Sequence, residues 1–289
     1  MLAPLHIKPA DSLTPIFGYH ALPKRREARR QRAAKAGHNK LSAWYISFCR
    51  KQALRGLTQP FDVEIEPRLK ARLYPHGNRC EKRAIAGLHH WDAQERSFLK
   101  QAILQSHNDF AFLDIGANVG LYSLFAAHYA RQSGKSLHIH AIEPDSENRR
   151  RLIDNMRANK FKAALWPVAI SNTAEELSLQ SHSDNRGEIK LSHSANGETV
   201  PVTTLTDIIS RSGLTKIDFM KLDIEGHDLR ALTHLFENTD HSLYPKYLII
   251  ETNGPDGISL KTLCYNQGYT VKGKGRLNLM LHRDDAEEN

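Results

Sequence analysis

The pattern of apolar and polar residues changes near residue 110 of this 289-residue chain. Before that point, apolar residues at helical spacing predict helices, and strict alternation of apolar and polar residues predicts a hairpin. These elements are the helices 41–57 and 92–105 and the hairpin strands 61–66 and 70–75. Asp92 and Glu95 are spaced as a capping box at the start of the second helix.

After residue 110, short apolar runs alternate with segments of helical periodicity. The expected strands are 111–116, 136–143, 164–171, 217–224, 246–252, 269–273 and 277–282, and the expected helices are 119–132, 145–160, 204–212, 227–237 and 258–267. Strands that alternate with helices predict an α/β fold with a doubly wound, mainly parallel sheet. The last two strands have no helix between them, so an antiparallel pair is expected at one edge. Residues 172–203 could form extra strands or a flap.

Three regions follow from these patterns. Residues 1–40 are expected to be a basic, flexible arm, residues 41–109 a cap of helices and a hairpin, and residues 110–289 the main domain. The chain carries a net charge of +8, and residues 1–56 hold 12 Lys/Arg against 2 Asp/Glu. Residues 111–289 hold 20 Lys/Arg against 23 Asp/Glu, so the basic character belongs to the beginning of the chain.

The basic segment 24–40 has three interpretations. It could be a solvated tail, a surface for an anionic partner such as nucleic acid, an acidic glycan or a lipid, or a mitochondrial targeting segment. No apolar run approaches about 18 residues, so no membrane span is expected, and no secretory signal is recognisable. The three scattered cysteines predict neither a disulfide framework nor a zinc site, and the cytoplasm is the expected compartment.

The turn after the strand at 111–116 differs from a dinucleotide-binding fingerprint. Asn118 stands where the fingerprint has its middle glycine, and Asp114 ends the strand. A carboxylate beside a pyrophosphate is unfavourable, whereas beside a cation it is favourable. S-adenosylmethionine carries two cationic groups and no phosphate, so the turn indicates this cofactor. Gly116 and Gly120 would let the backbone approach it closely, and Asn118 tolerates a left-handed conformation. The alternative is an ordinary tight turn with a solvated aspartate.

A second motif, "AIEPDSENRR" at 141–150, places Glu143 at the end of the next strand. An acid at this position is suited to accept hydrogen bonds from the ribose hydroxyls of an adenosine. Pro144 suits the first turn of the following helix. Capping of that helix is therefore a second role for Glu143, and the two roles are compatible.

A third motif, "DFMKLDIEGHDLRAL" at 218–232, places Lys221, Asp223 and Glu225 on one face of a strand. Asp223 and Glu225 are expected to contact the cofactor and the acceptor, and the candidates for a general base are Asp223, then Glu225, then His227. The alternatives are an internal ion pair of Lys221 with one acid, or a Mg²⁺ ion held by the two acids.

These motifs resemble the FkbM family of S-adenosylmethionine-dependent methyltransferases. The resemblance is carried by "LDIGANVGLYSL", "AIEPDSENRRRLIDN", "VPVTTLTDII" and "IDFMKLDIEGHDLRAL", and it covers about residues 110–255. It implies a Rossmann-like class I methyltransferase fold, with a seven-stranded sheet whose last strand is antiparallel. It also implies O-methylation of a hydroxyl, often on a sugar, glycolipid or natural product.

The resemblance also implies positions for the ligands. Asp114 and Gly116 would lie at the methionine end of the cofactor, Glu143 at the ribose, and Val168 and Ala169 near the adenine. Asp223, Glu225 and residues 251–253 would face the acceptor. Three rival functions remain open from the sequence: an RNA methyltransferase that uses the basic arm, a non-catalytic binding protein on the same fold, and a dehydrogenase.

Overall fold

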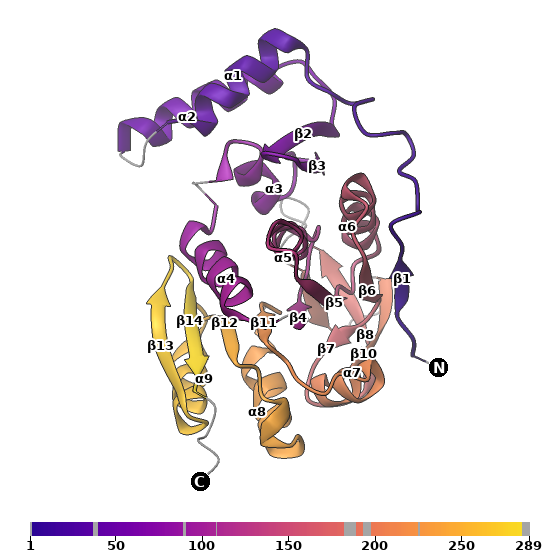
Figure 1. The fold of residues 1–289 in the computed structure, drawn as a ribbon, viewed down its shortest axis with the longest axis vertical. Helices are drawn as coiled ribbons and strands as arrows, with labels where there is room; N and C mark the ends of the chain where they lie inside the picture. Colours follow the sequence, from indigo (N-terminus) through magenta and orange to yellow (C-terminus); the bar gives the residue numbers. More distant parts are fainter. Residues whose placement is uncertain are drawn as a thin grey trace.

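The computed structural model describes residues 2–36, 40–88, 91–107, 109–181, 189–192, 198–224 and 226–284. Its largest element is a twisted sheet with helices on both faces (Figure 1). In the described residues this sheet has eight strands in the order β1-β6-β5-β4-β11-β12-β14-β13. They are β1 (Leu5–Ile7), β4 (Asp109–Ile115), β5 (Ser136–Ile142), β6 (Ala163–Trp166), β11 (Phe219–Leu222), β12 (Tyr247–Glu251), β13 (Tyr269–Lys274) and β14 (Asn278–Arg283).

The centre of this sheet is parallel and both edges contain antiparallel pairs. β4 pairs in parallel with β5 and β11, and parallel pairing continues to β6 on one side and β12 on the other. β14 lies antiparallel between β12 and β13. The prediction of a doubly wound α/β sheet with an antiparallel last strand is therefore confirmed. β1 adds an eighth strand, antiparallel to β6, that the sequence did not predict because three residues give too short a pattern.

Successive residues of the central strands point to opposite faces and build two apolar cores. Phe112 and Phe219 belong to the core beneath α4, α5 and α6, whereas Leu113 and Met220 belong to the core beneath α7, α8 and α9. These helices are α4 (Ala93–Gln105), α5 (Leu121–Gln132), α6 (Ser146–Asn159), α7 (Leu205–Ser212), α8 (Asp228–Asn238) and α9 (Gly257–Asn266), with a 3₁₀ turn η2 at His241–Leu243. Burial on both faces explains why the strands are apolar without alternation.

The N-terminal part packs a helical pair and a hairpin beside α5 and α6 (Figure 1). Its elements are α1 (Lys24–Ala34), α2 (Lys40–Leu54), β2 (Phe61–Glu66), β3 (Leu69–Leu73) and α3 (Arg79–Ala84). β2 and β3 pair antiparallel, which confirms the predicted hairpin.

Much of the expected flexible arm has defined structure. Ile7, Leu22 and Ala33 are buried, and the buried Arg30 donates to the Glu27 carboxylate and to the Glu64 carbonyl. A few apolar residues spaced among many cations were enough to fold this segment onto the domain. The domain boundaries at 40 and 109 stay predictions. In the described part of the chain, no helix is long and apolar enough to cross a membrane.

The segment that follows β6, up to Thr203, forms a second, smaller sheet. Its strands are β7 (Ala169–Ile170), β8 (Glu175–Ser181), β9 (Ile189–Ser192) and β10 (Glu198–Thr203), in the order β7-β10-β8-β9. Of the two forms expected for residues 172–203, the described residues therefore adopt extra strands.

Candidate functional site

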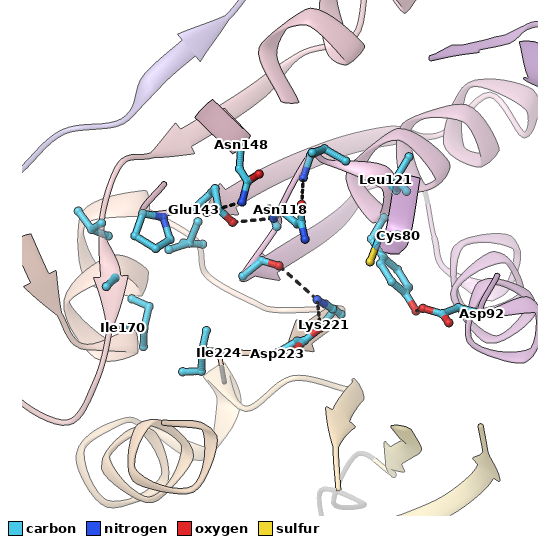
Figure 2. Close-up of a pocket in the computed structure, with 18 of the residues that line it drawn as sticks. Cys80, Asp92, Asn118, Leu121, Glu143, Asn148, Ile170, Lys221, Asp223 and Ile224 are labelled. Atoms are coloured by element: carbon cyan, nitrogen blue, oxygen red, sulfur yellow. Dashed lines mark hydrogen bonds and ion pairs between the residues drawn. The ribbon is translucent and has the colours of Figure 1, made fainter. Parts of the chain in front are cut away.

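A cavity of about 890 Å³, including its open mouth, lies beyond the C-terminal ends of β4, β5 and β11 (Figure 2). Open parallel sheets bind ligands at this edge. The predicted cofactor residues that line the cavity are Gly116, Asn118, Glu143, Pro144, Val168, Ala169 and Asp223. Asp114 and Gly120 do not line it.

The two glycines of the turn are needed for packing of the chain against itself. Gly116 has φ +71°, and a Cβ there would lie 1.9 Å from the Asp223 carbonyl oxygen. Gly120 has φ +78°, and a Cβ there would lie 2.6 Å from the Leu152 side chain. The glycines therefore allow close packing against Asp223, just past β11, and against α6, while the close approach of the backbone to the cofactor stays a prediction. Asn118 has φ +53°, so its predicted left-handed conformation is confirmed.

Glu143 lies at the end of β5 with its carboxylate facing the turn (Figure 2). Oε2 accepts from the Asn118 backbone N–H at 2.7 Å, and Oε1 accepts from the Asp145 N–H at 3.0 Å and the Asn148 side chain at 3.4 Å. Asp145, and not Glu143, accepts the Asn148 backbone N–H as the cap of α6. Burial raises the pKa of Glu143 to about 7, against the backbone hydrogen bonds that favour the charged form.

Asp114 lies beneath the turn, fully buried, and not in the cavity wall. Its Oδ2 accepts from the Ser123 backbone N–H at 3.1 Å and from the Ser123 hydroxyl at 2.6 Å, which fixes α5 to the end of β4. Burial raises its pKa, although the charge of Lys221 and the Ser123 hydrogen bonds act in the opposite direction. Its second oxygen, Oδ1, is buried without a hydrogen-bond partner in the described residues. The structure thus gives Asp114 a structural task, while its predicted role toward a cation stays a prediction.

Lys221 and Asp223 form an ion pair in the floor of the cavity. Lys221 Nζ lies 2.9 Å from Asp223 Oδ2 and donates to the Gly116 carbonyl at 3.2 Å. Burial disfavours the charged ammonium, but the charges of Asp223 and Asp114 outweigh it and raise the pKa of Lys221. The internal ion pair considered from the sequence therefore exists, and Asp223 also lines the cavity. β11 ends at Leu222, so Asp223 lies just past the strand that was expected to run to residue 224.

Glu251, at the end of β12, lies beside Asp223. Burial and the charges of Asp223 and Asp228 raise the pKa of Glu251 to about 7, and a hydrogen bond with Asp223 adds to this shift. Asp228 is occupied by the backbone, because it accepts from the N–H groups of Ile224 and Gly226. Asp223 and Glu251 are therefore neighbouring, hydrogen-bonded carboxyl groups.

The other two predicted bases are Glu225 and His227. Glu225 lies outside the described residues. The Nδ1 of His227 lies 3.3 Å from the hydroxyl of Ser171, and His227 precedes the first turn of α8. Within the described residues, no group of three or more His, Cys, Asp or Glu side chains is placed to hold a metal ion, so the suggested Mg²⁺ has no support.

The N-terminal part supplies three lining residues that the sequence did not identify: Cys80, Trp91 and Asp92. A fourth, Tyr122, comes from α5. Asp92 does not cap α4 with its side chain, contrary to the predicted capping box, and instead accepts from the Tyr122 hydroxyl at 3.1 Å. Burial, with the charges of Asp92 and Asp223, raises the pKa of the Cys80 thiol to about 12, which favours the protonated thiol over the thiolate. No local motif marks these residues, because only the fold brings them to the cavity.

The residues present fit S-adenosylmethionine. Ile142, Pro144, Val168, Ala169 and Ile170 form an apolar wall next to Glu143, which suits an adenine beside a ribose. Each carboxylate oxygen of Glu143 has acceptor capacity beyond one backbone bond. At the other end, Asp92 and Asp223 give the cavity wall acidic groups that suit a cationic ligand.

Comparison with known proteins finds one family model and several similar solved structures. A model of the methyltransferase FkbM domain matches residues 114–258. The METTL16 methyltransferase domain is a similar solved structure, with 14% identity, 88% of this chain and 86% of that chain covered, and a TM-score of 0.47. An S-adenosylmethionine-dependent methyltransferase from Agrobacterium tumefaciens has 12% identity, 78% and 70% coverage, and a TM-score of 0.45. TrmK from M. capricolum, in complex with S-adenosylhomocysteine, has 13% identity, 66% and 71% coverage, and a TM-score of 0.37. No curated protein matches the sequence.

Proposed function

The chain belongs to the FkbM family of S-adenosylmethionine-dependent methyltransferases, and we propose that its acceptor is a hydroxyl group of a sugar, a glycolipid or a related small molecule. The observation that carries this proposal is the carboxyl pair of Asp223 and Glu251 beside the cofactor pocket. An alcohol must lose its proton as it becomes methylated, and a carboxylate with a pKa near the working pH is suited to take it.

Each part of the pocket has a task in this proposal. When bound, S-adenosylmethionine supplies an activated methyl group on a sulfonium. Glu143 would accept from the ribose, the apolar wall around Val168 would cover the adenine, and Gly116 and Asp223 would lie toward the methionine; these residues all line the pocket. Holding donor and acceptor in line supplies several kcal/mol of the barrier.

Lys221 fixes the pair that removes the proton. Its Nζ lies 2.9 Å from one oxygen of Asp223, and Asp223 also makes a hydrogen bond with Glu251. Asp223 is the first candidate for the base that receives the hydroxyl proton, and Glu251 is the carboxyl group beside it. His227 is a weaker candidate because its ring nitrogen Nδ1 already makes a hydrogen bond with the Ser171 hydroxyl.

The test is to supply labelled S-adenosylmethionine with a panel of sugars and matched amino and deoxy analogues, and to locate the added methyl by mass spectrometry. We expect methyl ethers, formed by the wild type and strongly reduced in Asp223→Asn. Methylation of the amino analogues alone, with no ether formed from any hydroxyl acceptor, would contradict the proposal.

A nucleic-acid acceptor is the second candidate, because α1 exposes a row of cations: Lys24, Arg25, Arg29 and Arg32. Such a surface suits phosphate contacts, whose number sets the salt dependence of binding. Deleting residues 1–40 is a poor test, because it would also remove β1 from the sheet. Charge reversal of Arg25 and Arg29 keeps the fold, and should weaken binding to RNA and flatten its salt dependence if this candidate is right.

A further inference from the structure

A second cavity, of about 1300 Å³ including its open mouth, lies between α2 and α3 and is separate from the cofactor pocket. We call it the α2–α3 cavity. Its formally charged lining side chains all belong to Lys or Arg: Arg50, Lys51, Arg55, Arg79 and Lys82. No Asp or Glu is among its described lining residues. Clefts lined by one sign of charge concentrate ligands of the opposite sign.

Arg50 is a partly buried cation in the wall of this cavity. It is half-buried, and its guanidinium lies 3.5 Å from the Lys82 carbonyl and 3.4 Å from the Ser47 hydroxyl. In the described part of the chain no carboxylate pairs with it, whereas the buried Arg151 lies 2.6 Å from Glu81. Burial therefore lowers the pKa of Arg50. A partly buried cation without a counter-charge is costly, and an anionic ligand would remove that cost.

The rim of the α2–α3 cavity is already ordered. The Gln59 side chain accepts from the His76 backbone N–H at 2.9 Å, which holds the loop that forms one edge. Asn78, in the wall, accepts the Glu81 N–H through Oδ1 and donates through Nδ2 to Asn118 at 2.9 Å. Asn118 belongs to the cofactor turn. The hydrogen bond between Asn78 and Asn118 therefore joins the walls of the two cavities.

We propose that the α2–α3 cavity binds a phosphate group carried by the acceptor, so that the acceptor is a phosphorylated sugar. This inference rests on the proposed function, because it names the chemical class of the hydroxyl-bearing substrate. An arginine guanidinium can donate two parallel hydrogen bonds to two oxygens of one phosphate, and a lysine ammonium adds a positive point charge. With the phosphate in the α2–α3 cavity, the sugar extends over Asn78 toward the cofactor pocket.

The test compares glucose 1-phosphate with glucose by calorimetry on the full-length protein. We expect glucose 1-phosphate to bind and glucose not to bind. The double variant Arg55→Glu/Lys82→Glu changes two exposed lining residues and should weaken glucose 1-phosphate binding at least tenfold. Arg29→Glu, on the exposed face of α1 and outside the cavity, is the matched control and should leave it within twofold.

Titration with S-adenosylhomocysteine in every variant separates the two proposals and reports folding. If S-adenosylhomocysteine binds and glucose 1-phosphate does not, this inference is refuted and the proposed function stands. If only glucose 1-phosphate binds, the proposed function fails. Equal losses in the double variant and in Arg29→Glu would assign binding to general surface charge and overturn the site. A single-stranded oligonucleotide that binds far more tightly than glucose 1-phosphate, with losses in both variants, would replace the sugar phosphate by nucleic acid.

Discussion

Substitution of Gly116 by alanine tests how closely the cofactor turn is packed against the end of β11. Gly116 and Gly134 have nearly the same left-handed backbone, with φ +71° and +68°. A Cβ at Gly116 would lie 1.9 Å from the Asp223 carbonyl oxygen, whereas a Cβ at Gly134 would meet nothing within 4 Å. The two substitutions therefore share the cost of the backbone conformation and differ in the steric conflict.

The magnitudes follow from this difference. A non-glycine residue in the left-handed region costs about 1–2 kcal/mol, and the lower entropy of the unfolded chain offsets about 0.4–1 kcal/mol of it. We therefore expect Gly134→Ala to lower the free energy of unfolding by about 1 kcal/mol. At Gly116 the turn and β11 must also separate by about 1 Å, and forced packing of this kind costs about 1–3 kcal/mol more.

The assay is urea unfolding of the two variants and the wild type, with S-adenosylhomocysteine affinity as a second measurement. Gly116→Ala should lose at least twice as much unfolding free energy as Gly134→Ala. It should also bind S-adenosylhomocysteine more weakly, because the floor of the pocket moves. Equal losses of stability in the two variants, with equal affinity, would refute the packing argument.

Two further predictions concern the charged floor of the pocket. Lys221→Met should lower the free energy of unfolding by about 3–5 kcal/mol, because it leaves the buried Asp114 and its neighbour Asp223 without their cation. Chemical denaturation measures this loss, and a loss below about 1 kcal/mol would argue against this role of Lys221. Because the raised pKa of Glu251 is about 7, its base form appears as the pH rises through 7, so kcat/KM should increase over that range. Glu251→Gln should lose this dependence and about 10²–10⁴-fold in kcat while S-adenosylhomocysteine affinity is kept, and an unchanged pH profile would remove Glu251 from the carboxyl pair.

The sequence predicted the parts of the molecule in which local pattern and tertiary structure agree. The apolar run of β4, the left-handed Asn118 and the acid Glu143 at the next strand end are each set by residues close in sequence. Parallel strands bring their C-terminal ends to one edge, so these motifs were expected to meet there. The antiparallel pair of β13 and β14 was predicted because no helix lies between them.

The sequence could not predict contacts made by distant segments. Asp92 was expected to cap α4, yet its position opposite Tyr122 depends on how the N-terminal part packs on α5. Asp114 was expected at the methionine end of the cofactor; the structure shows it buried beneath the turn, where its Oδ2 accepts from Ser123, and its role toward a cation stays a prediction. Neither contact has a local signal, because each depends on which side chain of another element lies within hydrogen-bond distance in the folded chain.

The most direct test of the central claim is calorimetric titration of the purified chain with S-adenosylhomocysteine, alongside Glu143→Ala. Glu143 is buried in the pocket wall and offers its carboxylate to the expected ribose. The account predicts micromolar binding to the wild type and at least a tenfold weaker affinity for the variant. Absence of binding to a folded wild-type sample, or binding that the substitution leaves unchanged, would contradict it.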